Sequence, residues 1–70
     1  MDFPEFVRSV RKDLKLSQAG LAKAIDVNFT TISRWENNHV KPSNLAMKSF
    51  LDYCQSNYID IPEELQKHDE

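Results

Sequence analysis

Apolar residues recur along the chain at intervals of three and four, which is the spacing of one face of an α-helix. Residues 1–15 carry the first such set, and we predict a first helix there. Pro4 suits its first turn, where a missing N–H is tolerated, and Asp2 and Glu5 suit its positive end. The positions expected to face the core are Phe3, Phe6, Val7, Val10 and Leu14.

The next segment predicts two further helices joined by a very short break. Ser17 is a typical N-cap for a helix over residues 18–25, and Asn28 is the expected N-cap for a helix over residues 29–36. Helices this short do not form alone in water, so their mutual packing must hold them. The arrangement is that of a helix-turn-helix, whose second helix enters the major groove of DNA. The inward positions of that second helix are Ile32 and Trp35.

The remainder of the chain predicts one long and one short helix. Ser43 is the expected N-cap of a fourth helix, and a short fifth helix is expected to begin at Asp60 or Ile61. Residues 66–70 are expected to fray. The apolar face of the fourth helix comprises Leu45, Ala46, Phe50, Leu51 and Cys54.

The pattern as a whole predicts an all-α fold, a compact bundle of four to five short helices. Residues 1–57 form the predicted helix-turn-helix domain. Residues 58–70 form a short C-terminal helix and an acidic tail, a candidate contact for a dimer or for a partner protein.

The run LSQAGLAKAIDVNFTTISRWENNHVKPS resembles the helix-turn-helix domains of the phage lambda and 434 repressor and Cro class, the XRE family. It contains L-S-Q, L-A, a turn, a threonine-isoleucine pair, W-E, a loop and P-S in the order of that family. The resemblance extends from about Val7 to Tyr53 and implies a lambda repressor-like DNA-binding domain. The family usually has glycine where this chain has Asp26 and Asn38, and both residues tolerate left-handed backbone.

The outward face of the third predicted helix carries the residues that we expect to read bases. Phe29 has no stability reason to be exposed and suits a thymine methyl group, although folding inward beside Val27 is the alternative. Arg34 suits the O6 and N7 atoms of guanine, or a phosphate. Thr31 lies between the two faces. The predicted base-reading set is Phe29, Thr30, Ser33 and Arg34.

By resemblance, the start of the second helix and the loop after the third helix lie along the DNA backbone. Such contacts position a protein without specifying a sequence. Gln18 has two other interpretations, a contact to an outer base and an ordinary helix former. His39 is interpreted as an exposed loop histidine, because no partner for metal binding or catalysis is near it. The predicted backbone contacts are Gln18, Asn37, Asn38 and Lys41.

Other residues have architectural interpretations. By resemblance, Arg11 pairs with Glu36 and ties the first helix to the third, which constrains geometry more than it adds stability. The alternative is two unrelated surface charges. Gly20 costs about 1 kcal/mol relative to alanine inside a helix, and close packing against the third helix is the explanation we expect. Arg8 serves either solubility or attraction to phosphate.

Charge and composition refine this picture. The net charge is −2, yet residues 1–55 hold eight basic and six acidic side chains, whereas residues 56–70 hold one basic and five acidic ones. The mildly basic domain predicts moderate DNA affinity per protomer and a need for dimerisation. Cys54 is the single cysteine, which excludes an internal disulfide. No apolar run is long enough to span a membrane and the start does not resemble a leader, so we expect a cytoplasmic, nucleoid-associated protein.

These observations favour a sequence-specific regulator that binds double-stranded DNA as a homodimer and represses by occluding an operator. No residues remain for an effector domain, which makes occlusion simpler than activation. The alternative is a protein-interaction module of the same fold, such as an antitoxin-like or controller partner, that reads DNA weakly or not at all. The acidic tail is a candidate contact for a basic partner. No phosphate loop, metal cluster or Cys–His arrangement indicates an enzyme or a cofactor.

Overall fold

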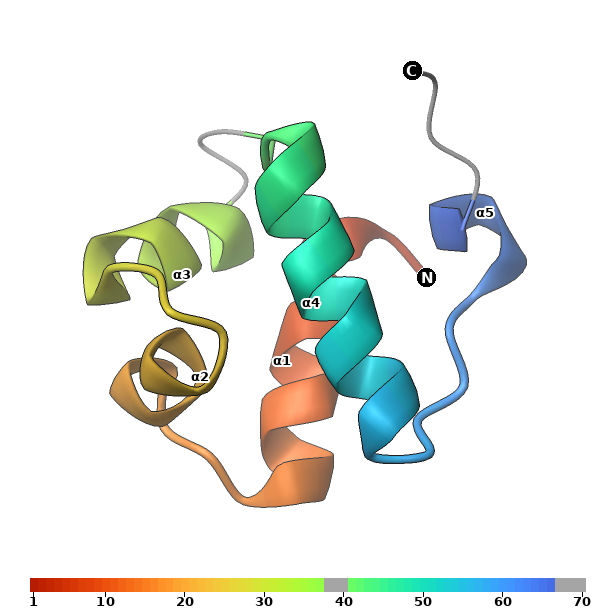
Figure 1. Cartoon of the computed structure of the whole chain (residues 1–70), viewed down its shortest axis with the longest axis horizontal. Helices are drawn as coiled ribbons and strands as arrows, with labels where there is room; N and C mark the ends of the chain where they lie inside the picture. Colours follow the sequence, from red (N-terminus) through yellow and green to blue (C-terminus); the bar gives the residue numbers. More distant parts are fainter. Residues whose placement is uncertain (38–40, 67–70) are drawn as a thin grey trace.

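A computed structural model describes residues 1–37 and 41–66 of the chain. It contains five helices, α1 (Phe3–Leu14), α2 (Gln18–Ala24), α3 (Phe29–Glu36), α4 (Asn44–Ser56) and α5 (Glu63–Gln66). Helices α1 and α4 run beside each other through the middle of the molecule, with α2 and α3 on one side and α5 on the other (Figure 1). No strand occurs within the described residues, which confirms the predicted all-α bundle.

Local signals set the helix starts. The side chain of Asp2 accepts from the backbone N–H of Glu5, and the side chain of Glu5 accepts from the backbone N–H of Asp2, which forms a capping box. Ser17 and Ser43 cap α2 and α4 by accepting from the backbone N–H three residues on. Asn28 occupies the N-cap position of α3 as predicted, but among the described residues its side chain makes no capping hydrogen bond.

Left-handed backbone follows three of the helices, at Lys15, Asp26 and Tyr58. Asp26 has a φ of 61° in the turn between α2 and α3, which confirms that it stands in for the glycine usual at that position. Lys15 has a φ of 58° at the C-terminus of α1, and Leu16 N–H then donates to the carbonyl of Arg11. The other predicted replacement, Asn38, and the loop residue His39 lie outside the described residues.

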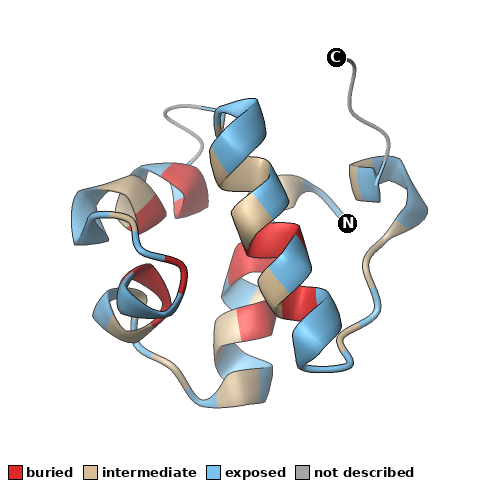
Figure 2. Cartoon of the chain, in the orientation of Figure 1, coloured by how far each residue is buried: buried red, intermediate tan, exposed pale blue. Residues whose placement is uncertain are grey.

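The core lies where α1 to α4 meet, and its buried positions follow the predicted apolar pattern (Figure 2). Trp35 and Phe50 pack edge-to-face with ring centroids 5.8 Å apart, and Phe3 packs against both rings. This confirms that Trp35 is a packing residue. The fully buried side chains of largest volume are Trp35, Phe50, Leu21, Ile32, Val7, Val10 and Cys54.

Two predictions about the C-terminal half were wrong. Leu45 is 76% exposed, because it lies five positions before Phe50 and therefore about 140° around α4, whereas Ala46 and Met47 pack on the core. The fifth helix begins at Glu63 rather than at Asp60 or Ile61, with Pro62 just before it. Gln66, which was also predicted to fray, is the last residue of α5, and its Nε2 donates to the carbonyl oxygen of Ile61 at 2.7 Å. The rest of that predicted segment, residues 67–70, lies outside the described residues.

Candidate nucleic-acid interface

The outer face of α3 is largely exposed, and two of its polar side chains have no partner among the described residues. Phe29 is 54% exposed, which excludes the alternative that it folds inward beside Val27. Thr30 and Arg34 are also exposed, and neither makes a hydrogen bond or ion pair through its side chain with another described residue. Ser33 and Thr31 are half-buried. The structure therefore presents an apolar ring, a hydroxyl and a guanidinium on one short helix.

The inner face of α3 is held by apolar packing and by a polar network. Ile32 and Trp35 are fully buried, and they set the rotation of α3 about its axis. Glu36 lies at the end of the helix and is 7% exposed. Among the described residues, no other charged residue is buried. Its carboxylate needs partners at this depth, because an unpaired buried charge is strongly unfavourable.

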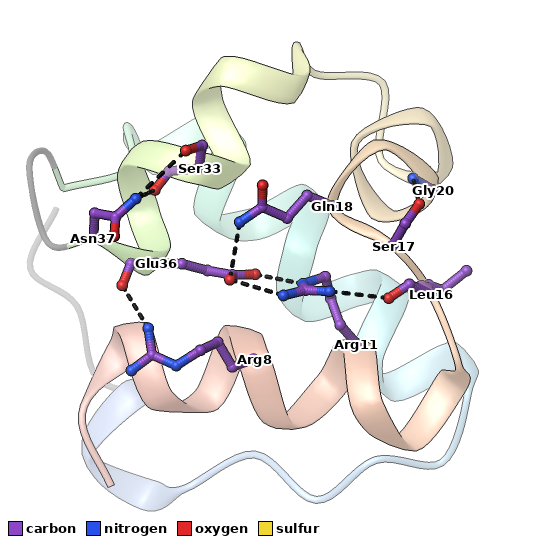
Figure 3. Close-up of polar contacts among 9 residues, drawn as sticks. All are labelled: Arg8, Arg11, Leu16, Ser17, Gln18, Gly20, Ser33, Glu36 and Asn37. Atoms are coloured by element: carbon purple, nitrogen blue, oxygen red, sulfur yellow. Dashed lines mark hydrogen bonds and ion pairs between the residues drawn. The ribbon is translucent and has the colours of Figure 1, made fainter.

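Arg11 supplies the main partner and confirms the predicted pair. Its Nη2 donates to Glu36 Oε1 at 2.9 Å, and its Nε donates to Oε2, so the two planar groups meet side by side (Figure 3). Nη1 of Arg11 also donates to the carbonyl oxygen of Leu16 at 3.1 Å. One guanidinium thus connects α1, the start of the helix-turn-helix and the end of α3.

These contacts change the ionisation of both groups. Burial disfavours the charged form of Glu36, but the hydrogen bonds from Arg11 and Gln18 outweigh burial, so the pKa of Glu36 is lowered. The hydrogen bond from Arg11 to Glu36 raises the pKa of Arg11 further above neutrality. Both side chains are therefore charged near pH 7.

The residues that were predicted to contact the DNA backbone differ in their surroundings. Gln18 is half-buried, and its Nε2 donates to Glu36 Oε1 at 3.1 Å. Asn37 is exposed, but its Nδ2 donates to the carbonyl oxygen of Ser33 at 2.8 Å. Lys41 is exposed and shares a shallow surface depression with Arg34, Thr31 and Ser43. The structure thus brings Lys41 beside the outer face of α3, whereas Gln18 lies by the polar network.

Arg8 is a residue of the network whose position the sequence reasoning did not settle. Its Nη1 donates to the backbone carbonyl oxygen of Glu36 at 2.6 Å, where α3 ends with unsatisfied carbonyl groups (Figure 3). The sequence spacing could have identified this role, because Arg8 lies three residues before Arg11 on the same helix. Arg8 and Arg11 together hold the C-terminus of α3 on α1.

The presence of glycine at position 20 has a different explanation from the one predicted. A Cβ at this position would lie 3.3 Å from Ser17 Oγ and 3.4 Å from the Leu16 side chain, and not against α3. The N–H of Gly20 is the donor to Ser17 Oγ, at 2.9 Å. The absence of a side chain therefore leaves room for the N-cap of α2.

The described residues contain neither a metal-binding cluster nor a reactive thiol. They contain no group of three or more histidine, cysteine or acidic side chains placed to hold a metal ion. Burial raises the pKa of Cys54 to about 12, so its thiol is not a nucleophile near pH 7. Across the two described ranges, no helix is both long and apolar enough to cross a membrane.

Comparisons with known proteins agree with this geometry. A family model described as helix-turn-helix matches residues 7–58. Repressor protein C2 of Salmonella phage P22 is 37% identical over 57 residues, which make up 79% of this chain and 26% of that protein. The chain therefore spans about a quarter of the length of that relative. No solved structure matches the chain.

Proposed function

The chain belongs to the XRE-type helix-turn-helix family, and on that premise we propose that it is a sequence-specific, double-stranded DNA-binding transcription regulator. The observation that carries the proposal is the division of α3 into two faces. The inner face is fixed by the core and by Arg11, Arg8 and Gln18, while the outer face is exposed. A helix held in this way, with Phe29, Thr30 and Arg34 exposed, suits insertion into a major groove.

Each outer residue has a chemical counterpart on DNA. Arg34 can donate two hydrogen bonds to O6 and N7 of guanine, and Phe29 can contact a thymine methyl group. Thr30 and Ser33 can donate to or accept from base edges. Lys41, beside Arg34, suits a phosphate. Asn37 and Asn38 follow α3 in the sequence, and by resemblance they are further candidates for contacts to the DNA backbone. We assign the first four residues to base reading and the others to positioning.

We propose a homodimer that represses by occluding its operator. The protomer measures 27 × 26 × 20 Å, less than the roughly 34 Å that separates successive major grooves on one side of DNA, so a symmetric site needs two copies. The phage relative is named a repressor protein, which favours repression. The domain would comprise residues 1–57, and residues 58–70 would supply the dimer or partner contact.

Tyr58 is the residue best placed for the dimer contact. It is 96% exposed, whereas the neighbouring apolar residues are half-buried and packed on the core. An exposed aromatic side chain is typical of interface anchors. Sedimentation of Tyr58→Ala should show weaker self-association than the wild type, with an unchanged melting temperature.

Selection from a random pool of duplex DNA tests the proposal. We expect enrichment of a short inverted repeat, and the affinity for the enriched duplex should fall steeply with salt because phosphate contacts release counterions. Lys41→Ala should weaken binding to all sequences alike and make the salt dependence shallower. Absence of any enriched sequence with the wild-type protein would overturn the proposal.

A protein-interaction module is the second candidate. Phe29 and Leu45 are exposed apolar residues, and Asp60, Glu63 and Glu64 form an exposed acidic segment before and within α5. Such a surface suits a basic partner protein. Salt-sensitive, sequence-dependent DNA binding separates the two candidates, because a module of this kind would show neither.

A further inference from the structure

An open hollow of about 490 Å³ lies between α1 and the segment that joins α4 to α5. This segment is on the opposite side of α1 and α4 from α2 and α3 (Figure 1). The volume is in the range of sites that bind small ligands or single side chains. A molecule bound in the hollow would therefore leave the outer face of α3 free.

The hollow combines an apolar wall with two acidic side chains. Phe6, Leu14 and Ile59 form the apolar wall, and all three belong to the core or pack against it. Asp13 and Asp60 line the same hollow, and both are exposed. Of the described residues that line it, none is a lysine, an arginine or a histidine. The side chains of the hollow therefore attract positive charge.

The two carboxylates are not engaged within the described structure. Neither Asp13 nor Asp60 forms a side-chain hydrogen bond or an ion pair with another described residue. Glu64, in contrast, pairs with the amino group of Met1 at 3.1 Å, so the positive charge at that edge of the hollow is already balanced. The oxygens of Asp13 and Asp60 remain available to accept from a donor outside the protein.

We propose that the hollow binds an arginine or lysine side chain from a basic segment of a partner protein. The apolar stem of such a side chain would lie along the apolar wall, while its charged head would meet the two carboxylates. A small inorganic cation has no stem and would gain nothing from that wall. Tyr58 also lines the hollow and is 96% exposed, and its ring face attracts the same charged head. This inference goes beyond the proposed DNA binding and does not depend on it.

A second copy of the chain is the other candidate occupant, because Tyr58 is also the residue assigned above to self-association. The charges favour the partner protein. A two-fold axis brings the same patch of both copies together, so the carboxylates of Asp13 and Asp60 would meet like charges in the hollow. Tyr58 is almost fully exposed, so it can contact a second copy without the hollow being filled.

Selection from a library of random peptides tests the inference, with the full chain as bait and without DNA. We expect enrichment of peptides in which arginine or lysine neighbours an apolar residue. The exposed cations Arg34 and Lys41 would select acidic peptides instead, so basic peptides report on a different surface. The affinity for an enriched basic peptide should fall as salt is added, because the contact is between charges.

A pair of double variants locates the binding site. Asp13→Asn with Asp60→Asn should weaken binding of an enriched basic peptide by at least roughly 10-fold, the loss expected for a charge-assisted hydrogen bond. Its melting temperature should match that of the wild type, because neither carboxylate is engaged. Asp26→Asn with Asp52→Asn is the matched control. It removes the same charge at positions that do not line the hollow, and it should bind the peptide as the wild type does.

Three results would overturn the inference. Equal losses in the two double variants would mean that basic peptides respond only to net charge. Failure of the wild type to enrich any basic peptide would leave the hollow without the proposed ligand. If, in addition, Asp13→Asn with Asp60→Asn changed the sedimentation of the protein, the occupant would be a second copy. None of these results bears on the proposed function, which selection of duplex DNA tests separately.

Discussion

The two faces of α3 differ in what their residues contact. On the inner face, Ile32 and Trp35 are fully buried, and Glu36 accepts hydrogen bonds from two side chains. On the outer face, Phe29 and Arg34 are exposed. A helix of eight residues is unstable alone, so the inner face must hold it. Phe29 and Arg34 are consequently not needed to hold α3 in place.

The polar part of the inner face determines geometry more than stability. Burying Glu36 has a desolvation penalty that offsets much of the attraction to Arg11. The planar, two-point contact between these groups nevertheless allows few relative orientations of α1 and α3. Arg8 adds a third point at the end of α3. The angle at which α3 projects from the domain follows from these contacts.

The largest expected effect comes from breaking the inner face. Glu36→Ala leaves Arg11 without its carboxylate in a partly buried position, and we expect a loss of about 3 kcal/mol in the free energy of unfolding. Urea denaturation measures it. Lys48→Ala is the matched control, because the Lys48–Asp52 pair is exposed and should contribute less than about 1 kcal/mol. Equal losses in the two variants would contradict the comparison.

Changing the outer face should affect binding and not folding. Arg34→Ala is expected to cost about 1–3 kcal/mol on the enriched duplex and to relax the preference for one base pair. Its unfolding curve should match that of the wild type, because Arg34 is exposed and has no ion pair among the described residues. An unchanged base preference would show that the outer face of α3 is not the reading surface.

The pH dependence of stability tests whether the charge of Glu36 helps to hold the inner face of α3. The folded-state pKa of Glu36 lies below its ordinary value of 4.5, so its contribution is present above about pH 4.5 and is lost as pH falls through the lowered pKa. The difference in unfolding free energy between the wild type and Glu36→Gln should therefore shrink as pH is lowered in this range. A difference that stayed constant would mean that the charge of Glu36 contributes nothing.

The smallest expected effect lies at the start of α2. Gly20→Ala gains helix propensity of about 1 kcal/mol, but its Cβ would approach Ser17 Oγ to 3.3 Å. We expect the two terms nearly to cancel, with a change within about 0.5 kcal/mol in urea denaturation and unaltered DNA binding. A stabilisation by the full gain in helix propensity would show that the Ser17 cap adjusts to the added Cβ without cost.

Much of the fold could be predicted from the sequence because its signals are local. Helix starts at Ser17 and Ser43 follow from side chains that reach a backbone N–H three residues on. The bounds of α3 and the left-handed turn at Asp26 follow from its short-range pattern. The outward position of Phe29 and Arg34 follows from the helical period once Ile32 and Trp35 are assigned to the core.

Tertiary structure decided which polar groups are engaged and which remain available. Glu36 meets Arg8 and Arg11 across separations of 28 and 25 residues, and no local pattern specifies the partners of the amide of Gln18. The exposure of Leu45 likewise depends on which side of α4 meets the other helices. Periodicity determines which residues share a face, but only the packing of helices determines what that face meets.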